Sequence, residues 1–153
     1  MQLVLDSVPP STYIGWEFLL GVDSLRNLQG DQSGALDPAH NMYWSWKTGY
    51  IFMRFKGDSP ESPLGKLHFD VGGIKPQTNT IRSLSFAFQE PLRLRSGMVA
   101  EINVAVDLAH LFKGGETIDF ANIYRCMGGP KAVKLADNYA NGMFEMRAVE
   151  ARQ

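Results

Sequence analysis

The 153-residue chain carries 15 Lys and Arg against 16 Asp and Glu. This near-neutral balance, without a basic cluster, gives no reason to expect a nucleic acid or an acidic membrane as partner. With 44% hydrophobic and 20% charged residues, the chain is typical of one globular domain with a real core. No stretch approaches the roughly 20 apolar residues that cross a bilayer, so we expect no membrane span.

The first elements in chain order are predicted to be strands. The N-terminus lacks the basic start and apolar centre of a secretory signal. It opens on Leu3 and Leu5 as a strand already under way would, which predicts that sequence is missing upstream. Ile14, Trp16, Phe18 and Leu20 then alternate on one face of a strand. Residues 23–41 follow as a long polar loop whose glycines and Pro38 are expected to break both helix and strand, and a loop of this length is usually functional or disordered.

Strand patterns continue through the middle of the chain. Alternation returns over residues 46–56, and Leu67, Phe69 and Val71 form the apolar face of the next strand. Residues 84–94 and 100–106 give two more alternating stretches. Short strands separated by turn signals are typical of an antiparallel β-sandwich.

Helical signals appear only in the C-terminal part. Asp107 is expected to start a short turn, Asp119 to cap a helix over FANIYRCM, and Pro130 to sit in the first turn of a helix over KAVKLADNYANGMF. Residues 144–149 alternate again and are predicted to be a strand. The fold class is therefore mainly β, an antiparallel β-sandwich with short helices in the C-terminal part, in a single domain over residues 1–153.

The three histidines are the first candidates for chemistry. His68 and Asp70 must share the face opposite the apolar one, about 6.5–7 Å apart along the strand. Two such side chains can converge on one zinc or copper ion, or can simply form a solvated strand face. His40 lies in the loop before a tryptophan pair and is a weaker candidate, and His110 is assigned a structural or surface role.

Other residue types give little support for chemistry. Cys126 is the single cysteine and is expected to be a small buried hydrophobic residue. The methionines are scattered at core-like positions, which favours a packing role. No nucleophile elbow, phosphate-binding glycine pattern or regular calcium loop is present, so we expect no enzyme activity.

The stretch NMYWSWKTGYI holds Trp44 and Trp46 one residue apart, flanked by tyrosines. Tryptophan is costly to expose, and its N–H requires a partner when buried. The pair is therefore either a core anchor at one end of the sandwich or a site where the indole itself is used.

The ordered string GVDS, LDP, MYWSW and GYI, followed by HFDVGGI and LADNYANGMF, resembles the MbnP-type copper-binding family. The resemblance implies an exported β-rich domain of the bacterial envelope, located in the periplasm. Relatives in this family bind copper through histidines and kynurenine, an oxidation product of tryptophan. A di-haem enzyme resembling cytochrome c peroxidase is the partner that this resemblance implies.

On this resemblance, the candidate metal residues are His40, Trp44, Trp46, His68 and Asp70, with Trp44 or Trp46 as the residue to be oxidised. Asp70 stands where the family pattern has a histidine before the Gly-Gly turn. A carboxylate is a harder ligand that suits copper(I) less well, and His68 is the candidate replacement. The family domain also begins with further strands, so the chain is expected to be N-terminally truncated.

The leading hypothesis is therefore a non-enzymatic copper-binding protein of the cell envelope. The alternative is a β-sandwich adhesion or carbohydrate-contact module that has lost metal binding, because aromatic side chains beside a polar loop also suit sugar stacking. Full burial of both tryptophans would exclude that alternative.

Overall fold

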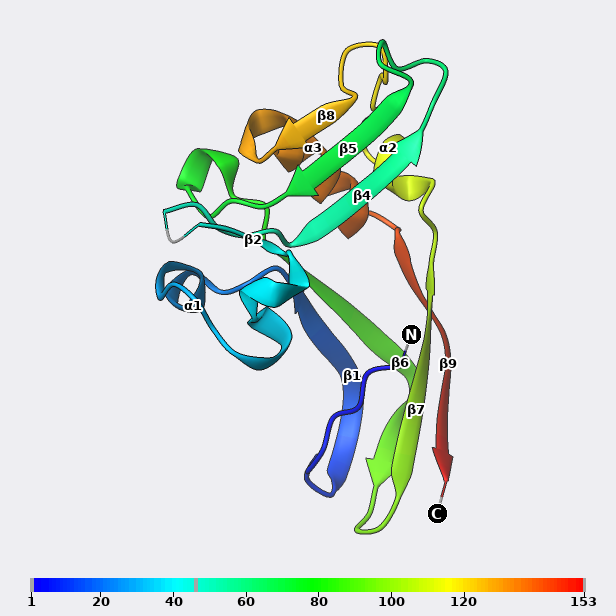
Figure 1. Ribbon diagram of the computed structural model, residues 1–153. Helices are drawn as coiled ribbons and strands as arrows, with labels where there is room; N and C mark the ends of the chain where they lie inside the picture. Colours follow the sequence, from blue (N-terminus) through cyan, green and yellow to red (C-terminus); the bar gives the residue numbers. More distant parts are fainter. Residues whose placement is uncertain (1, 46, 153) are drawn as a thin grey trace.

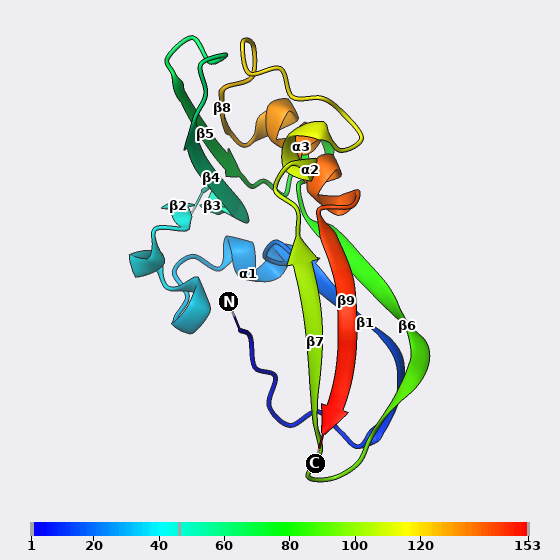
Figure 2. The ribbon, with the colours of Figure 1, turned by 90° about the vertical axis from the view of Figure 1, so that its right-hand side faces the viewer.

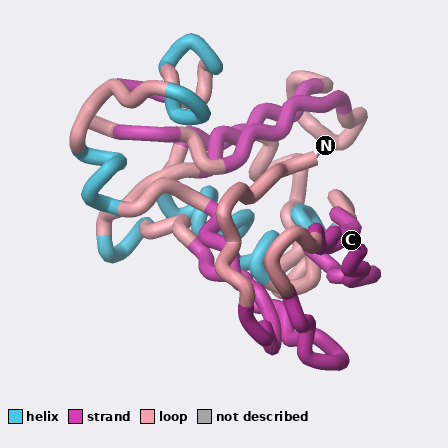
Figure 3. The backbone as a smooth tube through the Cα atoms, turned by 90° about the horizontal axis from the view of Figure 1, so that it is seen from below, coloured by secondary structure: helices cyan, strands magenta, loops and turns pink. Residues whose placement is uncertain are grey.

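The computed structural model describes residues 2–45 and 47–152. Most of its regular structure is β, arranged in several small sheets, with helices as short segments between the strands (Figure 3). One end of the molecule holds a three-stranded sheet with two helices, and the other holds two long ribbons of two strands each (Figure 1). This arrangement confirms the mainly β fold class.

The three-stranded sheet has the order β4-β5-β8. Strand β4 pairs antiparallel with β5, and β5 pairs in parallel with β8. The bounds are Met53–Asp58 for β4, Lys66–Val71 for β5 and Arg125–Met127 for β8. One face of this sheet is covered by helix α3, Gly129–Ala140, next to the short helix α2, His110–Lys113.

The core lies between this sheet and the helices. Leu67, Phe69 and Val71 of β5 are at most 5% exposed, which confirms their predicted apolar face. From the helical side the core receives fully buried side chains, including Leu111 of α2 and Leu135 of α3. An amphipathic strand and helices thus bury a common apolar layer.

The second part of the molecule is a two-layer sandwich. Antiparallel strands β1 and β6 form one layer, and antiparallel strands β7 and β9 form the other (Figure 2). An edge-on contact between the rings of Phe18 and Phe144, with centroids 5.4 Å apart, joins the layers. The bounds are Ser11–Leu20 for β1, Arg82–Leu94 for β6, Val99–Val106 for β7 and Phe144–Arg152 for β9.

The long polar stretch between β1 and β4 is not simply an irregular loop. It contains helix α1, whose start is capped by Asp23 through a hydrogen bond from the Arg26 amide, and two single turns of 3₁₀ helix. A small hairpin of β2 and β3 follows. The bounds are Ser24–Leu28 for α1, Gly34–Leu36 and Pro38–His40 for the two turns, Tyr43–Ser45 for β2 and Gly49–Tyr50 for β3; a third 3₁₀ turn, Pro76–Thr78, precedes β6.

Two further predictions about local structure were wrong. The segment after Asp119 does not form a helix: Asp119 caps one turn by accepting a hydrogen bond from the Ala121 amide, and the chain then becomes strand β8. The open edge of β5 supplies backbone partners for this strand, so tertiary pairing overrides the local helix signal. Ile14 is 78% exposed, because the register between β1 and β6 shifts between Tyr13 and Gly15.

The other C-terminal predictions are confirmed. The Asp107 carboxylate accepts a hydrogen bond from the Ala109 amide just before α2. Pro130 lies in the first turn of α3, although this helix ends at Ala140 and not at Phe144 as predicted, and the last alternating stretch forms β9. None of the helices in the described part of the chain is long and apolar enough to cross a membrane.

Candidate metal centre

The outer face of the β4-β5-β8 sheet brings together side chains from three strands. Across β5, His68 is in register with Lys56 of β4 and Arg125 of β8. One step along the same face, Asp70 is in register with Arg54 and Met127. Residues in register on neighbouring strands point to the same face, so these six side chains form two adjacent rows.

His68 and Asp70 do meet, as their spacing predicts. The His68 Nε2 atom lies 3.2 Å from Asp70 Oδ1. The His68 side chain is 46% exposed, whereas that of Asp70 is 3% exposed. The imidazole is therefore an accessible group held in place by a buried carboxylate.

Arg54 is the partner that sequence reasoning missed. Its Nε donates to Asp70 Oδ1 at 2.6 Å, and its Nη2 donates to Oδ2 at 3.0 Å. Burial alone raises the pKa of Asp70, but the hydrogen bonds and charge of Arg54, and then those of His68, hold that pKa below its usual value. Asp70 is thus an anion with both oxygens engaged.

Arg54 also connects this face to the polar stretch of the chain. Its Nη1 donates to the main-chain carbonyl of Asn41 at 2.6 Å. Asn41 has a left-handed backbone, with φ of 58°, and directly follows the turn that ends at His40. The start of the tryptophan segment is therefore fixed to the same guanidinium that holds Asp70.

Trp44 packs at the end of the strands that carry this face. A Cβ atom at Gly72 would lie 2.9 Å from Trp44 Cζ3, and one at Gly128 would lie 3.8 Å from Trp44 Cη2. Gly72 follows β5 and Gly128 follows β8, so the half-buried indole covers the ends of both strands. Within the described residues, the buried Nε1 of Trp44 has no hydrogen-bond acceptor.

The neighbouring tyrosines anchor the polar stretch. Tyr50 is 2% exposed, and its hydroxyl donates to the Gly30 carbonyl at 3.2 Å and accepts from the Gln32 amide at 3.1 Å. The ring of Tyr43 lies against that of Tyr50, with centroids 4.7 Å apart. The two tyrosines therefore have a structural role.

The remaining predicted residues lie apart from this arrangement. His40 is exposed, and its Nε2 lies 3.1 Å from the Gly34 carbonyl oxygen. Trp46 lies outside the described residues. Among residues 2–45 and 47–152, no three His, Cys, Asp or Glu side chains come together as a metal site.

The two neighbouring sulfur residues of β8, Cys126 and Met127, differ in burial. Cys126 is 7% exposed, as predicted, and burial raises the pKa of its thiol to about 11. Met127 was expected in the core but is 73% exposed. Strand alternation is the cause, because Cys126 takes the inner face and directs Met127 outward.

His110 has a surface role, as predicted. Its Nδ1 lies 3.0 Å from Asp107 Oδ2, and the histidine side chain is 42% exposed. His110 therefore offers a second exposed histidine with a carboxylate partner, on another part of the chain from His68.

The three-stranded sheet of this mainly β protein carries an accessible histidine that is braced by a buried carboxylate and an arginine. A β-sheet surface with this arrangement, close to a tryptophan, is compatible with metal handling. A family model described as MbnP matches residues 1–128, and the chain belongs to the MbnP family. The MbnP family is associated with copper in the periplasm and with an accessory, non-catalytic role. No curated protein and no solved structure matches the chain.

Proposed function

We propose that this chain is a non-enzymatic copper-binding protein of the bacterial cell envelope, with His68 as the central ligand. The single observation that supports this proposal is the fixed, exposed imidazole of His68. Its Nε2 is held by Asp70 Oδ1 at 3.2 Å, and its Nδ1 has no hydrogen bond to any described residue. Metal-bound histidines are typically braced in this way, with one ring nitrogen on a carboxylate and the other on the metal.

Asp70 then acts on the metal through His68. Both carboxylate oxygens already accept hydrogen bonds from Arg54, and Oδ1 also faces His68. An N–H donor at Nε2 fixes the tautomer that leaves Nδ1 with its lone pair. The carboxylate that stands at the family's histidine position thus orients the imidazole, and direct ligation by Asp70 would require Arg54 to move.

The tryptophans supply the second part of the proposal. Oxidation of Trp44 or Trp46 to kynurenine would open the indole and expose an aromatic amine and a ketone, which turns a poor ligand into a nitrogen donor. Trp44 covers the ends of β5 and β8, close to the face that carries His68. A di-haem enzyme resembling cytochrome c peroxidase would catalyse this oxidation, with peroxide as the oxidant, and His40 is a further candidate ligand.

Copper(I) titration against a competing chelator tests the role of His68. We expect binding tighter than micromolar and a loss of at least about tenfold in His68→Ala. His110→Ala is the matched control, because His110 is similarly exposed and also has a carboxylate partner. Affinity no better than micromolar, or equal effects of the two variants, would overturn the proposal.

Intact and peptide mass spectrometry of protein from the native host tests the oxidation. Kynurenine formation adds two oxygen atoms to the indole, and hydrolysis then releases the ring carbon as formate, so the net change in formula is a gain of two oxygen atoms and a loss of CO. We expect this change on the peptide that contains Trp44 and Trp46, with Trp44→Phe and Trp46→Phe identifying the residue. An unchanged peptide mass would remove kynurenine and the di-haem partner from the proposal but leave His68.

A further inference from the structure

We propose that Asn141 is a self-modification site, at which the neighbouring pair of Asp107 and His110 promotes conversion of the asparagine to aspartate or isoaspartate. This inference goes beyond the proposed copper function and uses residues on another part of the chain from His68. It derives from the sequence Asn141-Gly142, from the orientation of the His110 ring and from the exposure of the turn beside it.

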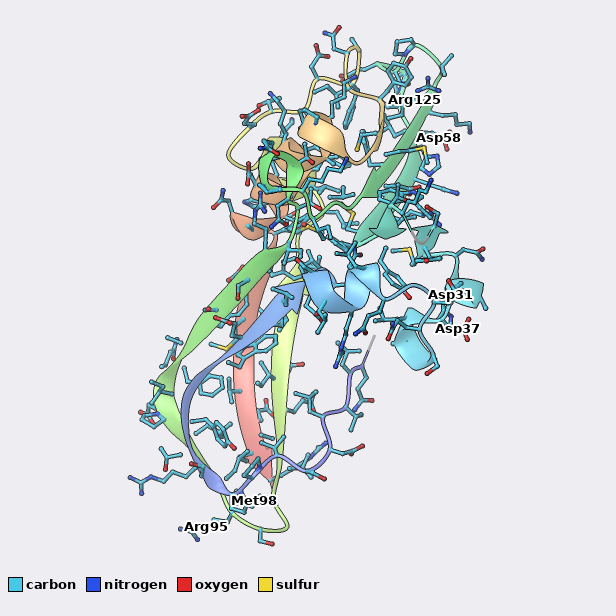
Figure 4. The ribbon with its side chains drawn as sticks, turned by 90° about the vertical axis from the view of Figure 1, so that its left-hand side faces the viewer. Asp31, Asp37, Asp58, Arg95, Met98 and Arg125 are labelled. Atoms are coloured by element: carbon cyan, nitrogen blue, oxygen red, sulfur yellow. The ribbon has the colours of Figure 1, made fainter. Side chains whose placement is uncertain are left out.

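Asn141 and Gly142 form a turn between two elements. Helix α3 ends at Ala140 and leads through this turn into β9, at the junction between the two parts of the molecule (Figure 4). Both turn residues are exposed, so water reaches the asparagine side chain. The 153-residue sequence contains no other Asn-Gly pair.

The local geometry leaves the reacting groups free. Asn141 has left the helical conformation, with φ of −103° and ψ of 69°. Among the described residues, neither its side-chain amide nor the Gly142 N–H makes a hydrogen bond. Gly142 has φ of 96°, a conformation that suits glycine, and its lack of a side chain leaves its nitrogen unhindered. The Gly142 nitrogen can therefore attack the side-chain carbonyl carbon of Asn141 without breaking an existing hydrogen bond.

His110 is oriented to accept the proton of that nitrogen. A Cβ atom at Gly142 would lie 3.1 Å from Cδ2 and 3.2 Å from Nε2 of His110, so this edge of the ring faces the glycine. Nδ1 lies 3.0 Å from Asp107 Oδ2, and a proton on Nδ1 leaves the lone pair on Nε2. Standard backbone geometry then places the Gly142 nitrogen within about 6 Å of Nε2, a gap that one water molecule can bridge.

Asp107 holds the ring in this orientation. The Ala109 amide and the His110 ring donate to its carboxylate and hold the pKa of Asp107 below its usual value. An ionised carboxylate on Nδ1 stabilises the imidazolium that forms when Nε2 takes up a proton. The pair therefore has the arrangement of a general base and its orienting acid.

The conversion needs water as its only co-reactant. The Gly142 nitrogen bonds to Cγ of Asn141 while its proton passes to Nε2 of His110. The bond between Cγ and Nδ2 then breaks, and the side-chain nitrogen leaves as ammonia after taking that proton back. Water opens the resulting five-membered imide at either carbonyl and gives aspartate or isoaspartate. The product carries a new negative charge just after α3, where the helix dipole disfavours it.

The test follows residue 141 by peptide mass spectrometry while the folded chain is incubated at neutral pH. Replacement of the amide by a carboxyl group raises the peptide mass, and chromatography separates aspartate from isoaspartate. We expect His110→Gln and Asp107→Asn each to slow the conversion by at least about tenfold. Lys113→Gln is the matched control and should convert at the native rate, because it changes an exposed side chain of the same short helix and leaves the imidazole in place.

The same four chains in urea separate the effect of His110 from the chemistry of the Asn-Gly sequence. Unfolding removes the ring from the turn, so all four chains should then convert at one rate, below that of the folded native chain. A folded native chain that converts no faster than His110→Gln and Asp107→Asn would overturn the proposal, and so would a difference between the chains that persists in urea. Circular dichroism checks each fold; if His110→Gln is unfolded, Asp107→Asn decides, because it keeps the imidazole.

Discussion

The guanidinium of Arg54 forms a two-point ion pair with the buried carboxylate of Asp70, across antiparallel strands β4 and β5. This pair explains how a charged side chain that is 3% exposed is tolerated on the face of a sheet. It also positions two other groups, because Asp70 holds His68 and Arg54 holds the main chain at Asn41. The pair is the structural base of the proposed metal site.

Removing one partner of this pair should cost more stability than removing both. We expect Arg54→Gln to lower the free energy of unfolding by about 2–3 kcal/mol, because Asp70 is left as a buried charge without a cation. The double variant Arg54→Gln/Asp70→Asn should recover part of this loss. Urea unfolding checks both expectations, with Lys56→Gln as the exposed control on the same strand. A loss from Arg54→Gln no larger than that control would show that the pair contributes little.

The close packing of Trp44 on Gly72 gives a second prediction. A Cβ atom at Gly72 would lie 2.5 Å from the Tyr50 carbonyl oxygen and 2.9 Å from Trp44 Cζ3. We expect Gly72→Ala to cost about 1–3 kcal/mol and to displace the indole, because the carbonyl is backbone and yields little. Unfolding in urea and iodide quenching of tryptophan fluorescence measure the two effects.

Gly115→Ala is the control for Gly72→Ala, because the nearest atom to a Cβ at Gly115 is 3.4 Å away on the Asn141 side chain. It should change stability by less than about 0.5 kcal/mol and leave quenching unaltered. Similar results for the two glycines would mean that Trp44 is not seated against Gly72.

The third prediction concerns the reactivity of Cys126. An exposed thiol is about half ionised near pH 8.5, but burial raises the pKa of Cys126 to about 11. Because only the thiolate is nucleophilic, alkylation by iodoacetamide at pH 8.5 should be far slower in the folded protein than in urea. Between about pH 8.5 and 11, the thiol of Cys126 keeps its proton in the folded protein but loses it in the unfolded protein. Deprotonation therefore favours the unfolded state, and the free energy of unfolding falls as pH rises through this range. Equal alkylation rates in buffer and urea would contradict the burial of this residue.

Local sequence patterns predicted most of the strands, but they did not predict which strands pair with one another or in which register. The spacing of His68 and Asp70 placed both on one face, and this contact is present. The partnership of Arg54 with Asp70 depends on the register between β4 and β5, which no local motif encodes. The exposure of Met127 depends in the same way on β8, a strand that local signals read as helix.

The register shift in β1 gives the last prediction, which compares two apolar residues that alternation assigns to one face. Phe18 stacks on Trp16 with ring centroids 5.1 Å apart and meets Phe144 of the opposite layer edge-on at 5.4 Å. Ile14 lies at the shift, between Tyr13 and Gly15, and is 78% exposed. We expect Phe18→Ala to lower the free energy of unfolding by about 2–3 kcal/mol through lost packing between the layers. Ile14→Ala should stay within about 0.5 kcal/mol, because its side chain is already in water. Urea denaturation of the two variants decides the register, since equal losses would place Ile14 in the interior with Phe18 and remove the shift.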